Sequence, residues 1–482
     1  MKARLRRSAA LLAGSLIPLV CLVGQPASAA PTDPLADAFT RAAATYEVPR
    51  DLLVALGYAE THLDGHAGAP SASGGYGVMH LVSNPTVHTL ERAATLTGQP
   101  VPALQADDAA NIRGGAAVLR AYADEAGLDA AARKDAGKWY RAVARYGNAS
   151  SPEVARLYAD TVYELLAQGV AAATPSGTVT VAPQAVQPDR GPYAQAPDLN
   201  SPRLAAAAVD YPGAKWVPAS PSNYAVSNRP AGDAIDRIVI HVTQGSYAGT
   251  ISWFQNPAAQ VSAHYVVRSS DGDITQMVRE KDRAWHAGNY NSRSVGIEHE
   301  GYVDNASWFT DAMYRASAAL TRNIADRYGI PKDRTHIVGH VEVPGADHTD
   351  PGRYWDWARY MQLVTGSGDG GGDGNPHTPQ SVCGSGYNVI DSAALGTAGT
   401  VYLLYNSSNG YNCVATIKRS SIGTATATTA YLEVQGQSRI TDSGNFAYYA
   451  GPVRAAGAGK CVKWGGKAGS SSYDSPFGHC GS

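Results

Sequence analysis

Two stretches of this 482-residue chain have compositions that form folded cores poorly, and they divide it into three parts. Residues 171–208 are rich in Ala, Pro, Gln, Val and Thr with little periodicity, and residues 366–380 contain Gly-Asp-Gly-Gly-Gly-Asp-Gly. Both compositions are typical of linkers. We therefore expect three domains, at residues 31–170, 209–365 and 381–482, in keeping with a typical size of about 150 residues per domain.

The start of the chain has the pattern of a secretory signal peptide. Three arginines precede an apolar run from Ala9 to Val23, and Ala27-Ser28-Ala29 is an A-x-A cleavage site. This pattern predicts a signal peptide over residues 1–29 and a secreted protein. No later stretch reaches about 18 apolar residues, so no membrane span is expected. The net charge of -2 gives no reason to expect a nucleic-acid partner.

The three parts differ in their patterns. Residues 31–170 are rich in Ala and Leu with helical periodicity, which predicts an all-α domain. Residues 209–365 mix short apolar runs with helical ones, as an α/β domain does. Residues 381–482 are rich in Gly, Ser, Thr and Tyr with short runs such as Thr400–Tyr405, which predict a small all-β module.

The four cysteines of the last part predict disulfide bonds, because an even count in a secreted protein favours pairing. Three pairings are possible. We favour the two local closures, Cys383–Cys413 and Cys461–Cys480. A zinc site made of all four is less expected, because they form no Cys-x-x-Cys pair.

The central part concentrates chemistry-bearing residues at the ends of short apolar runs. One run ends in His241, and another leads from His336 into a Pro/Gly-rich turn that carries His340, His348 and Asp350. A lone histidine is usually a surface or core residue with a satisfied hydrogen bond. This domain, however, holds seven of the thirteen: His241, His264, His286, His299, His336, His340 and His348. Two neutral imidazoles with one carboxylate can form an open zinc site that leaves a position for water.

A third run, Ser294–Glu300, alternates with period two. Glu298 and Glu300 therefore share one face of the expected strand, and His299 lies on the other.

Several motifs occur in the order found in one family: Ile238–His241, Ser262–Tyr265, Trp285–Gly288, Gly296–Glu298 and Gly339–Gly352. Over roughly residues 210–362 they resemble the type 2, zinc-dependent N-acetylmuramoyl-L-alanine amidases, relatives of phage amidases and peptidoglycan recognition proteins. The resemblance implies a mixed sheet flanked by helices. It also implies cleavage of the bond between muramic acid and the first alanine of the stem peptide.

The resemblance assigns roles by position. His241, His340 and Asp350 match the three zinc ligands, and Glu298 matches the carboxylate that acts on the attacking water. His348 stands where many members have lysine. We expect it to donate a hydrogen bond to the oxyanion that forms from the amide carbonyl, although histidine, unlike lysine, titrates near neutrality.

Alternatives to these roles remain open. His348 could be the third ligand with Asp350 behind it, and Glu300 could replace Glu298. His264 and His286 either line the cleft or are structural.

The N-terminal part carries one candidate acid. In a helix expected over Pro49–Leu63, Glu60 falls on the apolar stripe, although it could also lie at the edge of that stripe and reach solvent. Together with Gly74–His80, Asn111–Gly115 and Ala142–Asn148, it resembles the lysozyme-like lytic transglycosylases over roughly residues 35–168. In this sequence His80 replaces their Gln, and Gly147 interrupts their Tyr-Asn pair. The resemblance implies that Glu60 protonates the glycosidic oxygen. No second carboxylate stands out, which favours a transglycosylase over a hydrolase; the alternative is a domain that only holds glycan.

The C-terminal part resembles small spore-associated proteins of filamentous actinobacteria through Cys383–Tyr387, Gly410–Cys413 and Gly459–Gly466. Its aromatic residues could stack on sugars or pack structurally. Taken together, the resemblances imply a secreted or wall-associated zinc amidase acting on peptidoglycan glycan strands and stem peptides, and we expect a monomer. The alternative is a wall-binding protein that keeps the folds without activity.

Overall fold

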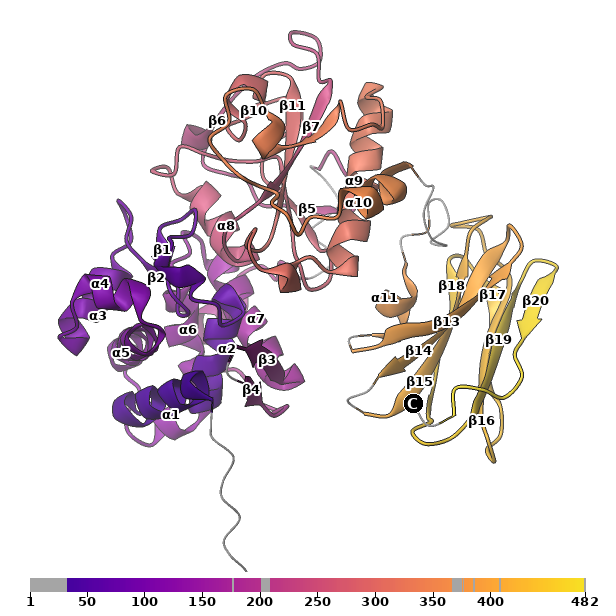
Figure 1. Cartoon of the computed structure of the whole chain (residues 1–482), viewed down its shortest axis with the longest axis horizontal. Helices are drawn as coiled ribbons and strands as arrows, with labels where there is room; N and C mark the ends of the chain where they lie inside the picture. Colours follow the sequence, from indigo (N-terminus) through magenta and orange to yellow (C-terminus); the bar gives the residue numbers. More distant parts are fainter. Residues whose placement is uncertain are drawn as a thin grey trace, which may run out of the picture.

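The computed structural model of the protein describes residues 33–175, 177–200, 209–365, 375, 377–384, 386–406 and 409–480. The expected signal peptide at residues 1–29 and most of the Gly-rich linker at 366–380 lie outside these residues. Figure 1 shows helices at the N-terminal end, a sheet flanked by helices in the middle, and a module of strands at the C-terminal end. The described helices include none long and apolar enough to cross a membrane.

The N-terminal part is helical, with one short hairpin, β1 (Gly75–Tyr76) and β2 (Leu81–Val82). Its helices are α1 (Pro34–Tyr46), α2 (Arg50–Thr61), α3 (Thr89–Thr97), α4 (Val101–Ala106), α5 (Asp108–Glu125), α6 (Tyr140–Tyr146) and α7 (Pro152–Gln168).

Helix α2 agrees with the helix expected over Pro49–Leu63. Its Leu53, Leu56, Gly57 and Glu60 are all buried, as their spacing along one helical stripe requires. Glu60 therefore points into the protein and does not reach solvent at the edge of the stripe.

The stretch 171–208, expected to be a linker, begins with a structured hairpin. Strands β3 (Val170–Thr174) and β4 (Gly177–Val181) pair antiparallel, and Val179 and Val181 are buried in the core of the helical part. The alternation of Thr and Val in β4 is a strand pattern, but it is too short to stand out from the surrounding Ala, Pro and Gln. Residues 201–208 lie outside the described residues.

The central part is a six-stranded mixed sheet with the order β12-β7-β11-β8-β9-β5. Strands β12, β7, β11 and β8 are parallel, whereas β8 and β9 are antiparallel. The strands are β5 (Ala214–Trp216), β7 (Arg237–Val242), β8 (Tyr265–Val267), β9 (Ile274–Gln276), β11 (Ser294–His299) and β12 (Ile337–Gly339). The mixed α/β sheet expected for this part is confirmed.

The two faces of this sheet have different partners. Helices α9 (Asp311–Tyr328) and α10 (Trp357–Thr365) pack on one face, against Ile238, Ile240 and Ile297. Since side chains alternate along a strand, Val239, His241 and Glu298 lie on the opposite face.

Helix α8 (Tyr247–Gln255) joins the central part to the helical part. Its Tyr247, Ile251 and Phe254 belong to the same buried apolar cluster as Leu53 of α2 and Leu157 of α7. Figure 1 shows α8 between the sheet and the N-terminal helices. The two parts therefore share one core.

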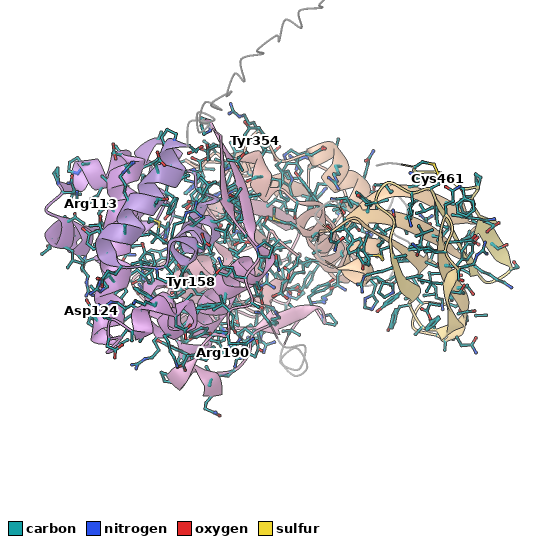
Figure 2. All side chains as sticks on the ribbon, turned by 90° about the horizontal axis from the view of Figure 1, so that it is seen from below. Arg113, Asp124, Tyr158, Arg190, Tyr354 and Cys461 are labelled. Atoms are coloured by element: carbon teal, nitrogen blue, oxygen red, sulfur yellow. A yellow bond between two sulfur atoms is a disulfide. The ribbon has the colours of Figure 1, made fainter. Side chains whose placement is uncertain are left out.

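The C-terminal module begins with α11 (Pro379–Cys383) and continues as two four-stranded antiparallel sheets, β13-β14-β15-β18 and β17-β16-β19-β20. The strands are β13 (Asn388–Leu395), β14 (Gly399–Asn406), β15 (Tyr411–Lys418), β16 (Thr426–Val434), β17 (Ile440–Phe446), β18 (Tyr449–Ala456), β19 (Val462–Ala468) and β20 (Ser471–Asp474). Both favoured disulfides, Cys383–Cys413 and Cys461–Cys480, are present; Figure 2 labels Cys461 in this module. The disulfide-bonded all-β fold is confirmed.

Candidate metal centre and its cavity

Three neighbouring strands bring the candidate residues of the central part to one edge of the sheet. Glu298 on β11 lies opposite His241 on β7, and Gly339 of β12 lies opposite Ile240, so that His340 follows beside His241. Because these strands are parallel, their carboxyl ends meet at the same edge, where ligand sites of open α/β sheets usually form.

Asp350 completes a group of three residues that could hold a metal ion. One donor atom from each of His241, His340 and Asp350 lies within 4.8 Å of the others. The carboxylate bridges the two imidazoles: Oδ2 is 3.2 Å from His241 Nδ1, and Oδ1 is 3.1 Å from His340 Nδ1. The backbone secures the turn, since the N–H of Val341 donates to the carbonyl of Asp350 at 3.0 Å.

The electrostatic state of these groups suits a divalent cation. Burial lowers the pKa of His241, which favours the neutral imidazole that coordinates metals. Burial opposes ionisation of Asp350, but its hydrogen bonds to His241 and His340 hold the pKa of that carboxyl below its usual range. Two neutral imidazoles and one carboxylate match the donor set of an open zinc site.

The second ring nitrogen of His241 also has a partner. His241 Nε2 and His286 Nδ1 share a hydrogen bond of 2.9 Å, and His286 Nε2 lies 3.2 Å from Ser294 Oγ. Gly296 makes room for this arrangement, because a Cβ there would stand 2.5 Å from His286 Nδ1. Such contacts behind a ligand fix its ring orientation.

Glu298 lines the same cavity, and one of its carboxyl oxygens lacks a hydrogen-bond partner in the described part of the chain. Among the described residues its Oε2 is a buried atom with no hydrogen-bond partner. Burial, and then the neighbouring Asp350 carboxylate, raise the pKa of Glu298 well above its usual range. A carboxyl with a free oxygen and a raised pKa beside a candidate metal site has the character of a proton acceptor and donor.

His348 lies at the mouth of the site. Its side chain is 62% exposed, and its ring stacks on that of His340 with 4.5 Å between centroids. It lines the cavity but does not belong to the group of three metal-binding candidates. This placement gives no support to His348 as the third ligand.

Three further residues left open by the sequence have clear placements. Glu300 accepts hydrogen bonds from the backbone N–H groups of Tyr247 and Ser269, and His264 contacts Arg229; neither lines the cavity. His286, by contrast, does line it. Glu300 and His264 therefore act within the fold, and His286 belongs to the site.

The cavity itself has a volume of about 390 Å³, and part of its wall comes from the helical part. The loop Pro70–Ser73 and His80 line it together with residues of the central part. The N–H of Ala72 donates to the carbonyl of Gln244 at 3.1 Å, which fixes this loop against the central part. Sequence reasoning missed this contribution, because no local pattern signals a contact between segments some 170 residues apart.

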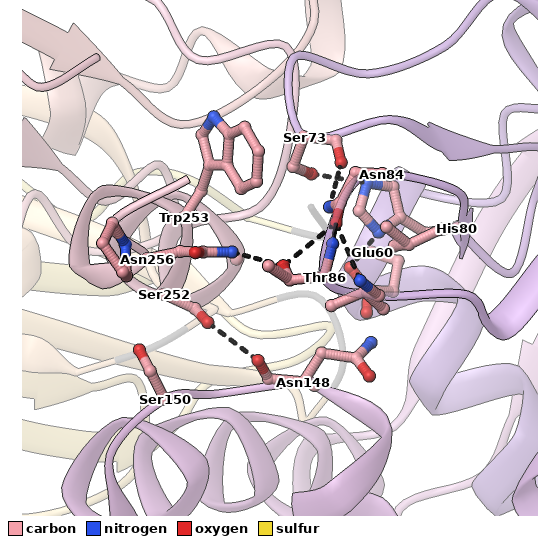
Figure 3. A pocket seen from close by; sticks show the side chains of 15 residues that line it. Glu60, Ser73, His80, Asn84, Thr86, Asn148, Ser150, Ser252, Trp253 and Asn256 are labelled. Carbon is pink, nitrogen blue, oxygen red and sulfur yellow. Dashed lines mark hydrogen bonds and ion pairs between the residues drawn. The ribbon is translucent and has the colours of Figure 1, made fainter. Parts of the chain in front are cut away.

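Glu60 lies in a second cavity, of about 260 Å³. It is 3% exposed; Tyr158 Oη donates to its Oε1 at 2.6 Å, and Ser246 Oγ from the central part donates to its Oε2 at 3.2 Å. His80 Nδ1 stands 3.5 Å from Oε2. Among the 15 residues that line this cavity, shown in Figure 3, Glu60 is the only carboxylate.

The other motif residues of the helical part differ in placement. Asn148 and Gly147 line the Glu60 cavity. Asn111 instead fastens the turn before β2: its Oδ1 accepts from the N–H of Met79 at 2.7 Å, and its Nδ2 donates to the carbonyl of Tyr76 at 2.9 Å. The last motif therefore lies at the cavity, whereas Asn111 holds the turn between Tyr76 and Met79.

The parallel-strand site with its His-His-Asp group is that of an α/β protein able to hold a catalytic metal. A family model described as N-acetylmuramoyl-L-alanine amidase matches residues 231–353. The chain is also 44% identical over 186 residues to N-acetylmuramoyl-L-alanine amidase A of Achromobacter lyticus, covering 35% of this chain and 100% of that protein. The chain therefore belongs to the N-acetylmuramoyl-L-alanine amidase family and is an enzyme of that class.

Two further relatives match over shorter stretches. The 1,6-anhydro-N-acetylmuramyl-L-alanine amidase AmpD of Haemophilus influenzae is 44% identical over 114 residues, 22% of this chain and 59% of that protein. Spore-associated protein A of Streptomyces coelicolor is 48% identical over 86 residues, 18% of this chain and 55% of that protein. In both cases the match covers less than two thirds of the relative.

Proposed function

We propose that this protein is a secreted peptidoglycan hydrolase that uses zinc to cleave the amide bond between N-acetylmuramic acid and L-alanine. The observation that carries the proposal is the His241–His340–Asp350 group beside Glu298, whose Oε2 is buried without a hydrogen-bond partner among the described residues. The identity of the cleaved bond is inferred from the family membership and from the names of the relatives. Secretion rests on the sequence pattern of residues 1–29.

Each residue has a part in the proposed reaction. His241, His340 and Asp350 hold the zinc, which when bound activates water near neutral pH and polarises a carbonyl. Glu298 accepts the proton of the attacking water and returns it to the leaving amine of alanine, for which its raised pKa suits it. His348, at the exposed mouth of the cavity, donates a hydrogen bond to the amide oxygen as negative charge develops there.

The test is release of new amino-terminal alanine from purified cell wall by the full chain. We expect activity that a chelator removes and added zinc restores. Glu298→Gln should lower turnover by about 10²–10⁴-fold, the usual contribution of a positioned general base. Asp326→Asn, on the exposed side of α9, makes the same chemical change away from the cavity and should leave the rate unchanged. No cleavage with or without metal would establish the alternative, a wall-binding protein without activity.

The role of His348 is tested by two substitutions. His348→Ala should lower turnover by about 10²–10³-fold, the usual loss of one oxyanion donor. His348→Lys keeps a donor and should retain most of the rate while changing its pH dependence near neutrality. If His348→Ala leaves turnover and the pH profile unchanged, the proposed role is wrong.

A second candidate function is cleavage of the glycan by Glu60. The favouring observation is that a buried carboxyl, hydrogen-bonded to Tyr158, lines a cavity of its own. With no second carboxylate among the lining residues, attack by a hydroxyl of the substrate itself fits better than hydrolysis. In the same cell-wall digests we expect new anhydro sugar ends with the unmodified chain and none with Glu60→Gln. If neither protein produces them, the helical part holds glycan without cutting it.

A further inference from the structure

The cavity of Glu60 and the cavity of the His241–His340–Asp350 group meet along one wall. Both are lined by Ser73, His80, Gly249 and Trp253. Their volumes are about 260 and 390 Å³. Joined, they fall in the middle of the roughly 300–1,000 Å³ range of small-molecule sites. The two cavities are therefore adjacent.

The Glu60 half is built by the two parts of the chain together. Ser252, Trp253 and Asn256 of the central part face residues of the helical part across it, as Figure 3 shows. Hydrogen bonds hold the two sides in place: Asn256 Nδ2 donates to Thr86 Oγ1 at 2.5 Å, and Ser252 Oγ donates to the carbonyl of Asn148 at 3.1 Å. The buried apolar cluster shared through α8 joins the two parts beside this half.

Apart from Glu60 and His80, the lining of the Glu60 half is uncharged and rich in hydrogen-bonding groups. Besides Glu60 and His80 it presents amides and hydroxyls, including Asn84, Thr86 and Ser150, around the half-buried indole of Trp253. Neutral donors and acceptors beside an aromatic face suit a carbohydrate with hydroxyl and N-acetyl groups. Glu60 and His80 are the only ionisable side chains among the lining residues, too few to balance a strongly charged ligand.

We propose that the two halves form a single groove for a peptidoglycan strand. The sugars lie along Trp253 in the Glu60 half, and the stem peptide of an adjoining sugar enters the half with the metal-binding residues. The helical part thereby makes the enzyme selective for glycan strands over single muramoyl peptides. This inference rests on the proposed amidase function, whose scissile amide lies at the metal end of the groove.

The first experiment uses the unmodified full chain. Peptide-free glycan strands, which lack the amide between muramic acid and alanine, are added to the amide-cleavage assay with a soluble muramoyl peptide as substrate. We expect the strands to inhibit competitively, with an inhibition constant equal to their dissociation constant measured by calorimetry. Strands that bind without inhibiting, or that do not bind, overturn the single groove.

The second experiment compares kcat/KM for polymeric peptidoglycan with kcat/KM for a single muramoyl peptide. Trp253→Leu keeps apolar bulk against the core but removes the aromatic face. We expect the polymer-to-monomer ratio and the affinity for peptide-free strands both to fall about tenfold, the size of one aromatic contact. Trp216→Leu is the matched control, because Trp216 on β5 lines neither cavity. A ratio unchanged in Trp253→Leu overturns the proposal.

The outcomes separate the two proposals. If amide cleavage is absent but strands bind in a Trp253-dependent way, the amidase function fails and the sugar half of the groove stands. If cleavage is metal-dependent but strands neither bind nor compete, the amidase function stands and the groove fails.

Discussion

At the scale of single residues, the candidate metal site depends on groups that do not touch the metal position. His286 shares a hydrogen bond with Nε2 of His241, and the absence of a side chain at Gly296 leaves room for the His286 ring. In the sequence Gly296 belongs to a strand pattern, where a glycine interior to the strand often marks a close approach. Here the approaching group is an imidazole behind a candidate ligand.

We therefore predict that Gly296→Ala displaces His286 and loosens the orientation of His241. Zinc affinity and amide cleavage should each fall about 10–100-fold, as is usual when the contact behind a ligand is lost. Metal titration with a chromophoric competitor measures the first, and alanine release measures the second. Gly232→Ala is the control, since the nearest atom to its added Cβ is 4.0 Å away. Unchanged zinc affinity in Gly296→Ala would show that His286 does not orient His241.

At the scale of elements, α8 has two roles that follow from its position. Its apolar side chains complete the core of the helical part, while Ser246, just before it, donates to Glu60 and Trp253 lines both cavities. Six of its nine residues are buried, and they lie around more than one side of the helix. A helix with buried residues around most of its circumference packs against more than one neighbour. The sequence of α8 itself does not indicate that the helical part is its second neighbour.

The shared core predicts that a cavity in α8 weakens both parts at once. Ile251 is fully buried, so Ile251→Ala should lower the free energy of unfolding by about 2–5 kcal/mol. Hydrogen exchange should show reduced protection in α2 and α7 as well as in β7 and β11. Ile390→Ala, at an exposed position of β13, should change neither. Loss of protection confined to the central sheet would contradict a shared core.

At the scale of the whole molecule, the chain combines a two-part unit, residues 33–365, with a module stabilised by disulfides. All four cysteines of the described residues lie in the module, and the two bonds close loops with sequence separations of 30 and 19. Cross-links stabilise mainly by restricting the unfolded chain. Their effect is therefore confined to the module.

Reduction should separate the two stabilities. With a phosphine reductant we expect the unfolding transition of the module to lose about 2–4 kcal/mol per bond, while that of residues 33–365 stays in place. Differential scanning calorimetry resolves the two transitions, and the double variant Cys383→Ser/Cys413→Ser isolates one bond. A drop in amide cleavage on reduction would mean that the module supports the active unit, contrary to this expectation.

The sequence by itself determined the main helices and strands around the site and the order of the site residues along the chain, although not the hairpin of β3 and β4. Periodicity placed Glu60 on the buried stripe of α2 and separated Glu298 from His299 across β11, because helix and strand periods are local properties of the chain. The spacing of the cysteines favoured the pairing that is present. The clustering of histidines at the ends of short apolar runs indicated a metal site, and the resemblance to the type 2 amidases singled out His241, His340 and Asp350.

Only the tertiary structure decided what lies next to what. Glu298 and Glu300 share a strand face, yet packing around α8 gives Glu300 two backbone partners and leaves Glu298 in the cavity. The contact of Ser246 with Glu60, and the wall that Pro70–Ser73 adds to the metal cavity, depend on the docking of two distant segments. Docking of this kind is set by the sum of many weak apolar contacts across a surface, and no local pattern in the sequence encodes that sum.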